Sequence, residues 1–184
     1  MNINGLPFLQ FKSQLIYEFG EERLNDFFEA LKDTNSFFED AVLATTKIPL
    51  EDFLAFMDAM VKEFYNDDEK IFWKFGKQAA IVSLRESGPY YAFMRSKRTP
   101  ESFFSSILHR VWTMTYDEGI AKNVVEGNFF HVYILNLPLY HVYLEYSTMG
   151  FVKKALELYG TTIKEIIKVK ASAKEIYYKL ILDL

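Results

Sequence analysis

Residues 112–158 constrain the fold of this chain most strongly. The segment starts at the end of a helical pattern, continues as two strand-like runs over residues 120–125 and 128–136, and ends in a second helical pattern. Glu126-Gly127 lies between the two runs and is a hairpin turn signal. A helix, an antiparallel hairpin and another helix are therefore predicted in direct succession.

The first half of the chain predicts helices. Apolar residues recur at helical spacing over residues 15–19, 21–31, 50–64, 71–82 and 103–111. Asn35 is expected to cap a short helix, and Pro49 is expected to occupy the first position of the helix that follows it. Thr99 is expected to cap the helix that begins at Pro100.

The residues after the hairpin predict one more helix and two more strands. Ser147 or Thr148 is expected to cap that helix, and Gly160 to end it. Residues 161–170 and 174–184 then read as strands because apolar residues alternate along the second run.

The order of elements predicts an α+β fold, in which N-terminal helices pack with a C-terminal antiparallel sheet of about four strands. We expect residues 1–184 to form a single domain. Its N-terminal part, residues 1–47, is expected to be helical, and residues 48–184 are expected to form the core.

Composition excludes several classes of function. The chain has no cysteine, which excludes disulfides, thiolate catalysis and zinc sites built from cysteine. The net charge of −4 argues against nucleic-acid binding. No apolar run is long enough to span a bilayer, and the N-terminus lacks the pattern of a signal peptide, so a cytoplasmic protein is expected.

Aromatic residues are abundant, at 17% of the chain. Such a surplus favours an aromatic-lined pocket or an oligomer interface, and a phenylalanine-rich core is the alternative. The sequence shows no H-E-x-x-H motif, no glycine-rich phosphate loop and no G-x-S-x-G motif. We therefore predict no catalytic residue and no metal site, and we do not expect an enzyme.

Two aromatic clusters are the candidates for a binding site. His109, Trp112 and Tyr116 recur at i, i+3 and i+7 beside the apolar stripe of one predicted helix. They form either the wall of a pocket or a packing face that includes a satisfied histidine.

The second cluster lies between the hairpin and the next helix and consists of Tyr140, His141, Tyr143 and Tyr146. Connections between elements often carry binding groups. The alternative is a buried crossover whose hydroxyl and imidazole groups satisfy backbone carbonyls.

From these clusters we predict a non-enzymatic sensor or small-ligand-binding module with an aromatic-lined apolar pocket. The predicted ligand is small and apolar or aromatic, and the predicted ligand-binding residues are His109, Trp112, Tyr116, Phe130, Tyr140, His141 and Tyr143. A dimeric protein–protein interaction scaffold is the alternative function, with a homodimer or another protein as partner.

Four stretches carry a resemblance to a known superfamily: I-P-L-E-D-F-L, F-W-K-F-G-K-Q-A-A, T-P-E-S-F-F and V-W-T-M-T-Y-D-E-G. The chain resembles the superfamily that joins haem-nitric-oxide-binding domains, 4-vinyl-reductase-type domains and the TRAPP transport-particle subunits of vesicle tethering. Within it, the chain is most similar in pattern to an uncharacterised, mainly bacterial family.

The resemblance has different implications for each branch. Haem-binding members use a helix histidine, to which His109 is similar in position, and a Y-x-S-x-R motif for the haem propionates. That motif is absent here, and the segment from Tyr140 to Tyr143 does not replace it. We therefore expect no cofactor, with a haem-based gas sensor using His109 as the alternative. The tethering members are scaffolds, several of which dimerise through helices, and the cysteines frequent in the vinyl-reductase-type members are absent.

Overall fold

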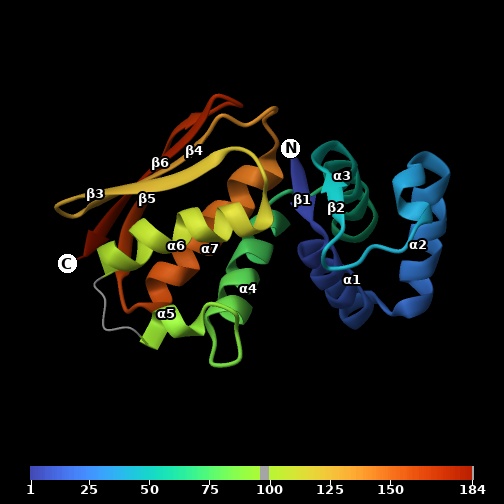
Figure 1. Cartoon of the computed structure of the whole chain (residues 1–184), viewed down its shortest axis with the longest axis horizontal. Coiled ribbons are helices and arrows are strands. Elements are labelled where there is room, and N and C mark those ends of the chain that lie inside the picture. Colours follow the sequence, from blue (N-terminus) through green and yellow to red (C-terminus); the bar gives the residue numbers. More distant parts are fainter. Residues whose placement is uncertain (96–99, 184) are drawn as a thin grey trace. The chain divides into compact units, whose positions relative to one another are not determined.

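The computed structural model describes residues 1–95 and 100–183, and it describes their side chains except those of residue 93 and residues 100–106 (Figure 1). The expected cap Thr99 and the predicted apolar residues before Ile107 lie outside this description. The chain forms two compact units. The first is Met1–Asp68 with Met114–Asp117, and the second is Glu69–Thr113 with Glu118–Leu184. The boundary expected after residue 47 falls inside the first unit.

The first unit consists mainly of helices. Its elements are β1 (Asn2–Asn4), α1 (Gly5–Phe19), α2 (Glu21–Thr34), the 3-10 helix η1 (Ser36–Glu39), β2 (Lys47–Pro49) and α3 (Leu50–Tyr65). The Oδ1 atom of Asn35 accepts the backbone N–H of Phe37 at 3.0 Å, which confirms the predicted cap. The prediction for Pro49 is wrong by one residue: Pro49 ends β2, paired with Asn2, and the helix begins at Leu50.

Phenylalanine rings fill the core of the first unit. The ring of Phe8 lies 5.8 Å from Phe28, 5.4 Å from Phe38 and 4.9 Å from Phe56. Phe27 joins the same cluster, 5.5 Å from Phe28. These rings come from α1, α2, η1 and α3, so a large share of the aromatic surplus is used in packing these four elements together.

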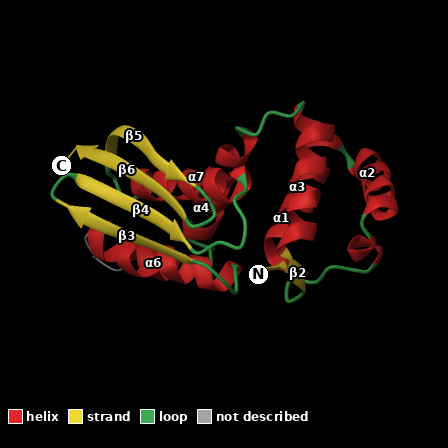
Figure 2. Cartoon of the chain, turned by 90° about the horizontal axis from the view of Figure 1, so that it is seen from above, coloured by secondary structure: helices red, strands yellow, loops and turns green. Residues whose placement is uncertain are grey.

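The second unit is a sheet covered on one face by helices. The helices are α4 (Ile71–Leu84), α5 (Tyr91–Arg95), α6 (Pro100–Thr115) and α7 (Val142–Leu158). The strands are β3 (Ile120–Glu126), β4 (Phe129–Leu135), β5 (Thr162–Ala171) and β6 (Glu175–Asp183). They pair antiparallel in the order β3-β4-β6-β5, with α4, α6 and α7 on the same side of the sheet (Figure 2). The predicted α+β fold with a four-stranded antiparallel sheet is confirmed.

The start of α7 differs from the prediction. The helix begins at Val142 and is capped by His141, whose Nδ1 atom accepts the backbone N–H of Tyr143 at 3.0 Å. Ser147 and Thr148 lie inside the helix instead of capping it. The hydroxyl of Ser147 donates to the carbonyl of Tyr143 at 2.6 Å, which is the bond that a hydroxyl makes in a helix interior.

Helices α4 and α7 pack backbone against backbone. A Cβ atom at Gly76 of α4 would overlap the carbonyl oxygen of Ser147, and one at Gly150 of α7 would overlap the carbonyl oxygen of Trp73. Because glycine is the residue that permits this approach, the two glycines fix the position of α7 relative to α4.

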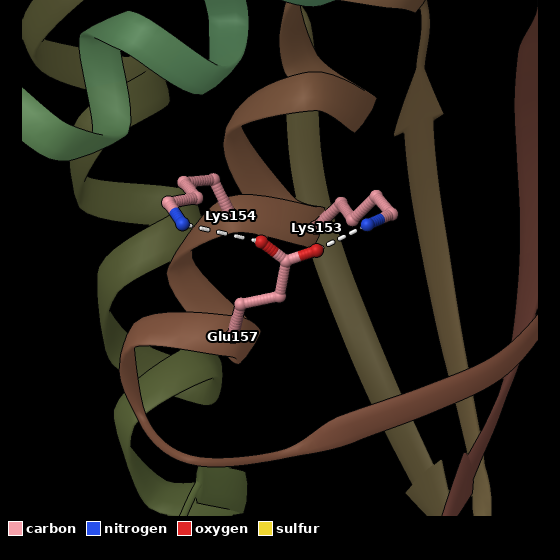
Figure 3. Close-up of polar contacts among 3 residues, drawn as sticks. All are labelled: Lys153, Lys154 and Glu157. Carbon is pink, nitrogen blue, oxygen red and sulfur yellow. Dashed lines mark hydrogen bonds and ion pairs between the residues drawn. The ribbon is translucent and has the colours of Figure 1, made fainter.

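Charged pairs stabilise the last turns of α7. Glu157 accepts from Lys153 four residues earlier and from Lys154 three residues earlier, the latter at 3.3 Å (Figure 3). The hydrogen bond from Lys153, more than the other contacts, lowers the pKa of Glu157 below its ordinary value. Spacings of three and four residues place these side chains on one face of the helix.

No helix in the part of the chain described here is both long and apolar enough to cross a membrane.

Candidate functional site

A carboxylate lies fully buried between α7 and the sheet. Glu145, in the first turn of α7, has no exposed surface. The Tyr140 and Tyr178 hydroxyls each donate to one of its two oxygens. The Lys168 ammonium lies 2.6 Å from the oxygen that Tyr178 also contacts. We call these four residues the Glu145 network.

Three different segments bring the network together. Tyr140 belongs to the connection from β4 to α7. Tyr178 lies on the helix-covered face of β6 and pairs with Lys168 of β5. Lys168 alternates regularly with Ile166, which pairs with Leu180, and so lies on the helix-covered face. A register shift after Lys168 places Lys170 opposite Tyr177, on the other face.

The network is closed on one side and open on the other. Tyr178 is buried, whereas Tyr140 is 39% exposed and the Lys168 side chain is 44% exposed. A buried carboxylate is stable only with hydrogen-bond donors and positive charge around it, because its transfer from water is costly. The positive charge here comes from the exposed side of the network.

Both tyrosines of the network act as hydrogen-bond donors to the Glu145 carboxylate. Burial, followed by the hydrogen bond to the Glu145 carboxylate, raises the pKa of Tyr178 well above its ordinary value. The same two causes, in the same order, raise the pKa of Tyr140. Their hydroxyls therefore stay protonated through the neutral range and hold the carboxylate in place.

Aromatic rings border the open side of the network. The Lys168 ammonium lies 5.8 Å from the ring centroid of Tyr146, and Trp73 of α4 stands edge-on to Tyr146 at 6.1 Å. A carboxylate on one side and an aromatic face on the other form the environment that proteins use for organic cations. In this structure the ammonium of Lys168 lies in that environment.

The structure brings part of the second predicted cluster to this site. Tyr140 is a member of the network and Tyr146 borders it. Tyr143 is buried next to them in sequence, but its ring packs on Phe72 of α4 at 5.4 Å. His141 caps α7, and its ring lies 6.2 Å from the same phenylalanine.

The other predicted residues lie apart. His109 of α6 is exposed, whereas Trp112 on the same helix is buried and donates its Nε1–H to the Glu118 carbonyl at 3.0 Å. Tyr116 is buried in the first unit, where its backbone bridges to Ile3. Phe130 is buried on the helix-covered face of β4. An aromatic-lined pocket formed by these residues stays a prediction.

Sequence reasoning missed the central carboxylate and its lysine. Glu145 is an acidic residue within an apolar and aromatic run, and Lys168 breaks the apolar positions of a strand. Each is a weak signal alone, because isolated charges are common in surface helices and strands. No group of three or more histidine, aspartate or glutamate side chains able to hold a metal ion occurs among the residues described.

The sequence matches no protein family model and no curated protein. Solved structures resemble the chain over nearly its whole length. An H-NOX protein of S. oneidensis in the Fe(II)NO ligation state has a TM-score of 0.72 at 10% identity, with 99% of this chain and 100% of that chain covered. A variant of the same protein in the Fe(II) state has a TM-score of 0.73 at 11% identity, covering 99% and 97%.

An H-NOX variant of K. algicida in the unliganded Fe(II) state has a TM-score of 0.72 at 14% identity, covering 99% of this chain and 97% of that chain. These likenesses establish that the chain has the H-NOX fold. The superfamily resemblance noted in the sequence is thereby confirmed at the level of the fold, and a fold alone does not define a function.

Proposed function

We propose that this chain is a non-enzymatic small-ligand sensor module built on the H-NOX fold, and that its ligand binds at the Glu145 network. The observation that carries the proposal is a fully buried carboxylate whose cationic partner, Lys168, is 44% exposed. The similar H-NOX protein of S. oneidensis is in a ligation state with a small molecule, NO, which supports a sensing role for this fold.

The chemistry of the site favours a small organic cation with an apolar body. The aromatic surplus of the sequence predicts an apolar or aromatic ligand, and the rings of Tyr146 and Trp73 suit such a body. The buried charge of Glu145 adds the requirement for a positive group. A cation over an aromatic ring is stabilised by roughly 0.5–2 kcal/mol, depending on its desolvation. An alkylammonium ion meets both requirements.

Binding would exchange one cation for another. The Lys168 side chain is 44% exposed, so its ammonium can return to water once another cation takes its place beside Glu145. The carboxylate keeps a positive partner throughout the exchange. The released lysine belongs to β5, so occupancy of the site would change the charge presented at that strand, which is the signal we infer for the sensor.

Calorimetric titration of the purified chain with n-butylammonium chloride tests this proposal. Saturable heat is expected for the natural chain, and none for Glu145→Gln, in which the charge is removed at nearly constant volume. 1-Butanol and sodium chloride serve as controls for the apolar body and for ionic strength. Equal heats for the natural chain and Glu145→Gln, or no saturable heat at all, would contradict the proposal.

Haem does not fit the Glu145 network. The two propionates of haem carry negative charge, and the hydroxyls of Tyr140 and Tyr178 already donate to the Glu145 carboxylate. His109, the residue similar in position to the haem ligand of the family, is exposed on α6. We therefore expect no Soret shift after haem addition. A shift that is lost in His109→Ala would instead support the gas-sensor alternative.

A dimeric interaction scaffold is the second candidate function. The observation that favours it lies on the face of the sheet opposite the helices (Figure 2), where the rings of Tyr133 and Tyr177 stack at 4.6 Å.

A further inference from the structure

The sheet has a face opposite α4, α6 and α7 (Figure 2). Four aromatic rings lie on it, those of Phe129, His131, Tyr133 and Tyr177. Tyr133 of β4 and Tyr177 of β6 stack at 4.6 Å between centroids, with their planes 15° apart. His131 and Phe129 continue the row along β4, 6.4 Å apart. We call this surface the outer face. It is completed by Ile120, Lys122, Val124, Glu126, Leu135, Glu165, Ile167, Lys170, Glu175, Lys179, Ile181 and Asp183.

A buried polar atom lies at the centre of the outer face. His131 is buried, with 8% of its surface exposed, and its Nδ1 atom is hydrogen-bonded to the Tyr177 hydroxyl at 2.8 Å. Its Nε2 atom is buried and has no hydrogen-bond partner among the residues described. The nearest carboxylate oxygen, of Glu126, is 3.7 Å away. Buried polar atoms rarely lack partners, so this atom indicates a surface that something else covers.

Charge is ordered along the strands of the outer face. The cross-strand row through Val124, His131 and Lys179 divides the face, because these residues pair with one another across β3, β4 and β6. On β3, Lys122 lies two residues before Val124, and Glu126 lies two residues after it.

Strand β5, at the opposite edge of the sheet, repeats this order. Ile167 pairs with the central row, Lys170 lies on the same side as Lys122, and Glu165 lies on the same side as Glu126. One end of the outer face therefore carries Lys122 and Lys170, of which Lys170 is paired with Glu175 of β6 at 2.7 Å. The other end carries Glu126, Glu165 and Asp183.

We propose that the outer face binds the outer face of a second copy of this chain about a two-fold axis. An axis that runs across the strands along the central row brings the basic end of one copy onto the acidic end of the other. Lys122 then faces Glu126 of the second copy, and Lys170 faces its Glu165. A two-fold interface is self-complementary by definition, and these two lysine–glutamate pairs meet that condition. Glu175 and Asp183 of β6 would face each other, and each is paired with a lysine of its own copy, Glu175 with Lys170 and Asp183 with Lys164.

The aromatic residues suit the same arrangement. Tyr133 of one copy faces Phe129 of the other, which places aromatic rings at the centre of the interface, where they are enriched in natural interfaces. Lys179 leans away from the central row, with its ammonium 3.6 Å from the Phe129 ring centroid. The two Lys179 ammonium groups of a dimer are thereby kept apart.

The size of the outer face predicts a weak dimer. Seven residues of β4 at ~3.3 Å each, and four strands ~4.8 Å apart, give a face of roughly 23 by 19 Å. Such an area is small for a permanent interface, so association is expected to depend on protein concentration. Because the face carries acidic as well as basic residues, a polyanion such as single-stranded nucleic acid is a poorer fit than a second copy.

Sedimentation velocity over a range of protein concentrations tests the proposal with a charge swap. Lys122→Glu and Glu126→Lys each place like charges opposite one another at two symmetric points, so each is expected to weaken the dimer roughly tenfold or more. The double variant restores opposite charges, and dimerisation is expected to return. Lys74→Glu, an exposed position on α4, changes the net charge equally and is expected to leave the dimer unchanged.

Circular dichroism of each variant controls for folding, since both substituted side chains are exposed. A chain that stays monomeric at every concentration would overturn the proposal. So would a dimer that the single reversals leave intact, or that the double variant fails to restore.

Discussion

The Lys168 ammonium lies 2.6 Å from the Glu145 carboxylate, although the lysine side chain is 44% exposed and the glutamate is completely buried. The two partners of this ion pair thus differ in their access to water. The carboxylate has no exposed surface, whereas the lysine side chain that carries the ammonium is in contact with solvent. The difference makes the lysine the exchangeable member of the pair and is the basis of the function proposed here.

Removal of the lysine is expected to destabilise the chain. Lys168→Gln leaves a buried carboxylate without its ammonium partner, and we expect a loss of about 1–3 kcal/mol in the free energy of unfolding. Lys164→Gln on the same strand is the matched control, because the Lys164–Asp183 pair is more than half exposed on both sides. Lys164→Gln is expected to lower the free energy of unfolding by less than about 1 kcal/mol. Urea unfolding of both variants measures the difference, and equal losses would contradict the special role of Lys168.

Stability is expected to fall with pH above the ordinary tyrosine pKa of 10.0. Folding raises the pKa of Tyr178, so its contribution is fully present below pH 10.0 and is lost as pH rises toward the folded value. Tyr178→Phe should flatten this decline, whereas Tyr17→Phe, at a residue 91% exposed, should not. Unfolding midpoints measured from neutral to alkaline pH check this. A slope that Tyr178→Phe leaves unchanged would speak against the hydrogen bond to Glu145.

Gly76, at the contact between α4 and α7, is expected to tolerate no larger residue. Gly76→Ala places a Cβ atom on the carbonyl oxygen of Ser147, and the backbones must separate to admit it. We expect Gly76→Ala to lower the free energy of unfolding by about 1–3 kcal/mol or more, as overpacking of a core does. Gln78→Ala, at an exposed position of the same helix, is expected to be neutral or stabilising because alanine favours helices. Thermal unfolding compares the two, and an unchanged midpoint for Gly76→Ala would show that the contact is absent.

The charge of Glu157 is expected to stabilise α7 at neutral but not at acidic pH. Because folding lowers the pKa of Glu157, its contribution is present above the ordinary value of 4.5 and is lost as pH falls through the folded value. At neutral pH, Glu157→Gln should lower the free energy of unfolding by ~0.2–0.5 kcal/mol for each lost pair. In acid it should lower it little. Glu29→Gln on α2 removes the single pair with Lys32 and should cost less. A loss that is independent of pH would contradict the ion pairs.

The hairpin and the strand pair after α7 could be predicted because their signals are local. Glu126-Gly127 turns the chain between two runs of strand type, and β6 alternates strictly between buried and half-buried positions. Strands β1 and β2 could not be predicted in this way. Each has three residues, too few to show a period, and the two lie more than forty positions apart.

The Glu145 network could be predicted in part. Tyr140 is recognisable because it lies in a cluster of rings along the sequence. Glu145, Lys168 and Tyr178 come from α7, β5 and β6, and they meet because Lys168 pairs with Tyr178 on the helix-covered face of β5, a strand whose register shifts twice. A bulge of this kind has no clear signature in a single sequence, and a lone charge in an apolar run resembles an ordinary surface residue.

Chemical rescue of Lys168→Ala tests the central claim most directly. The substitution removes an ammonium and its methylenes, and n-propylammonium supplies both. Added n-propylammonium chloride is expected to raise the unfolding midpoint of Lys168→Ala, beyond any effect of n-propanol or of sodium chloride at equal ionic strength. Lys164→Ala and the double variant Glu145→Gln with Lys168→Ala are expected to show no such rise. A rise of the same size in either control, or none in Lys168→Ala, would contradict a cation site at Glu145.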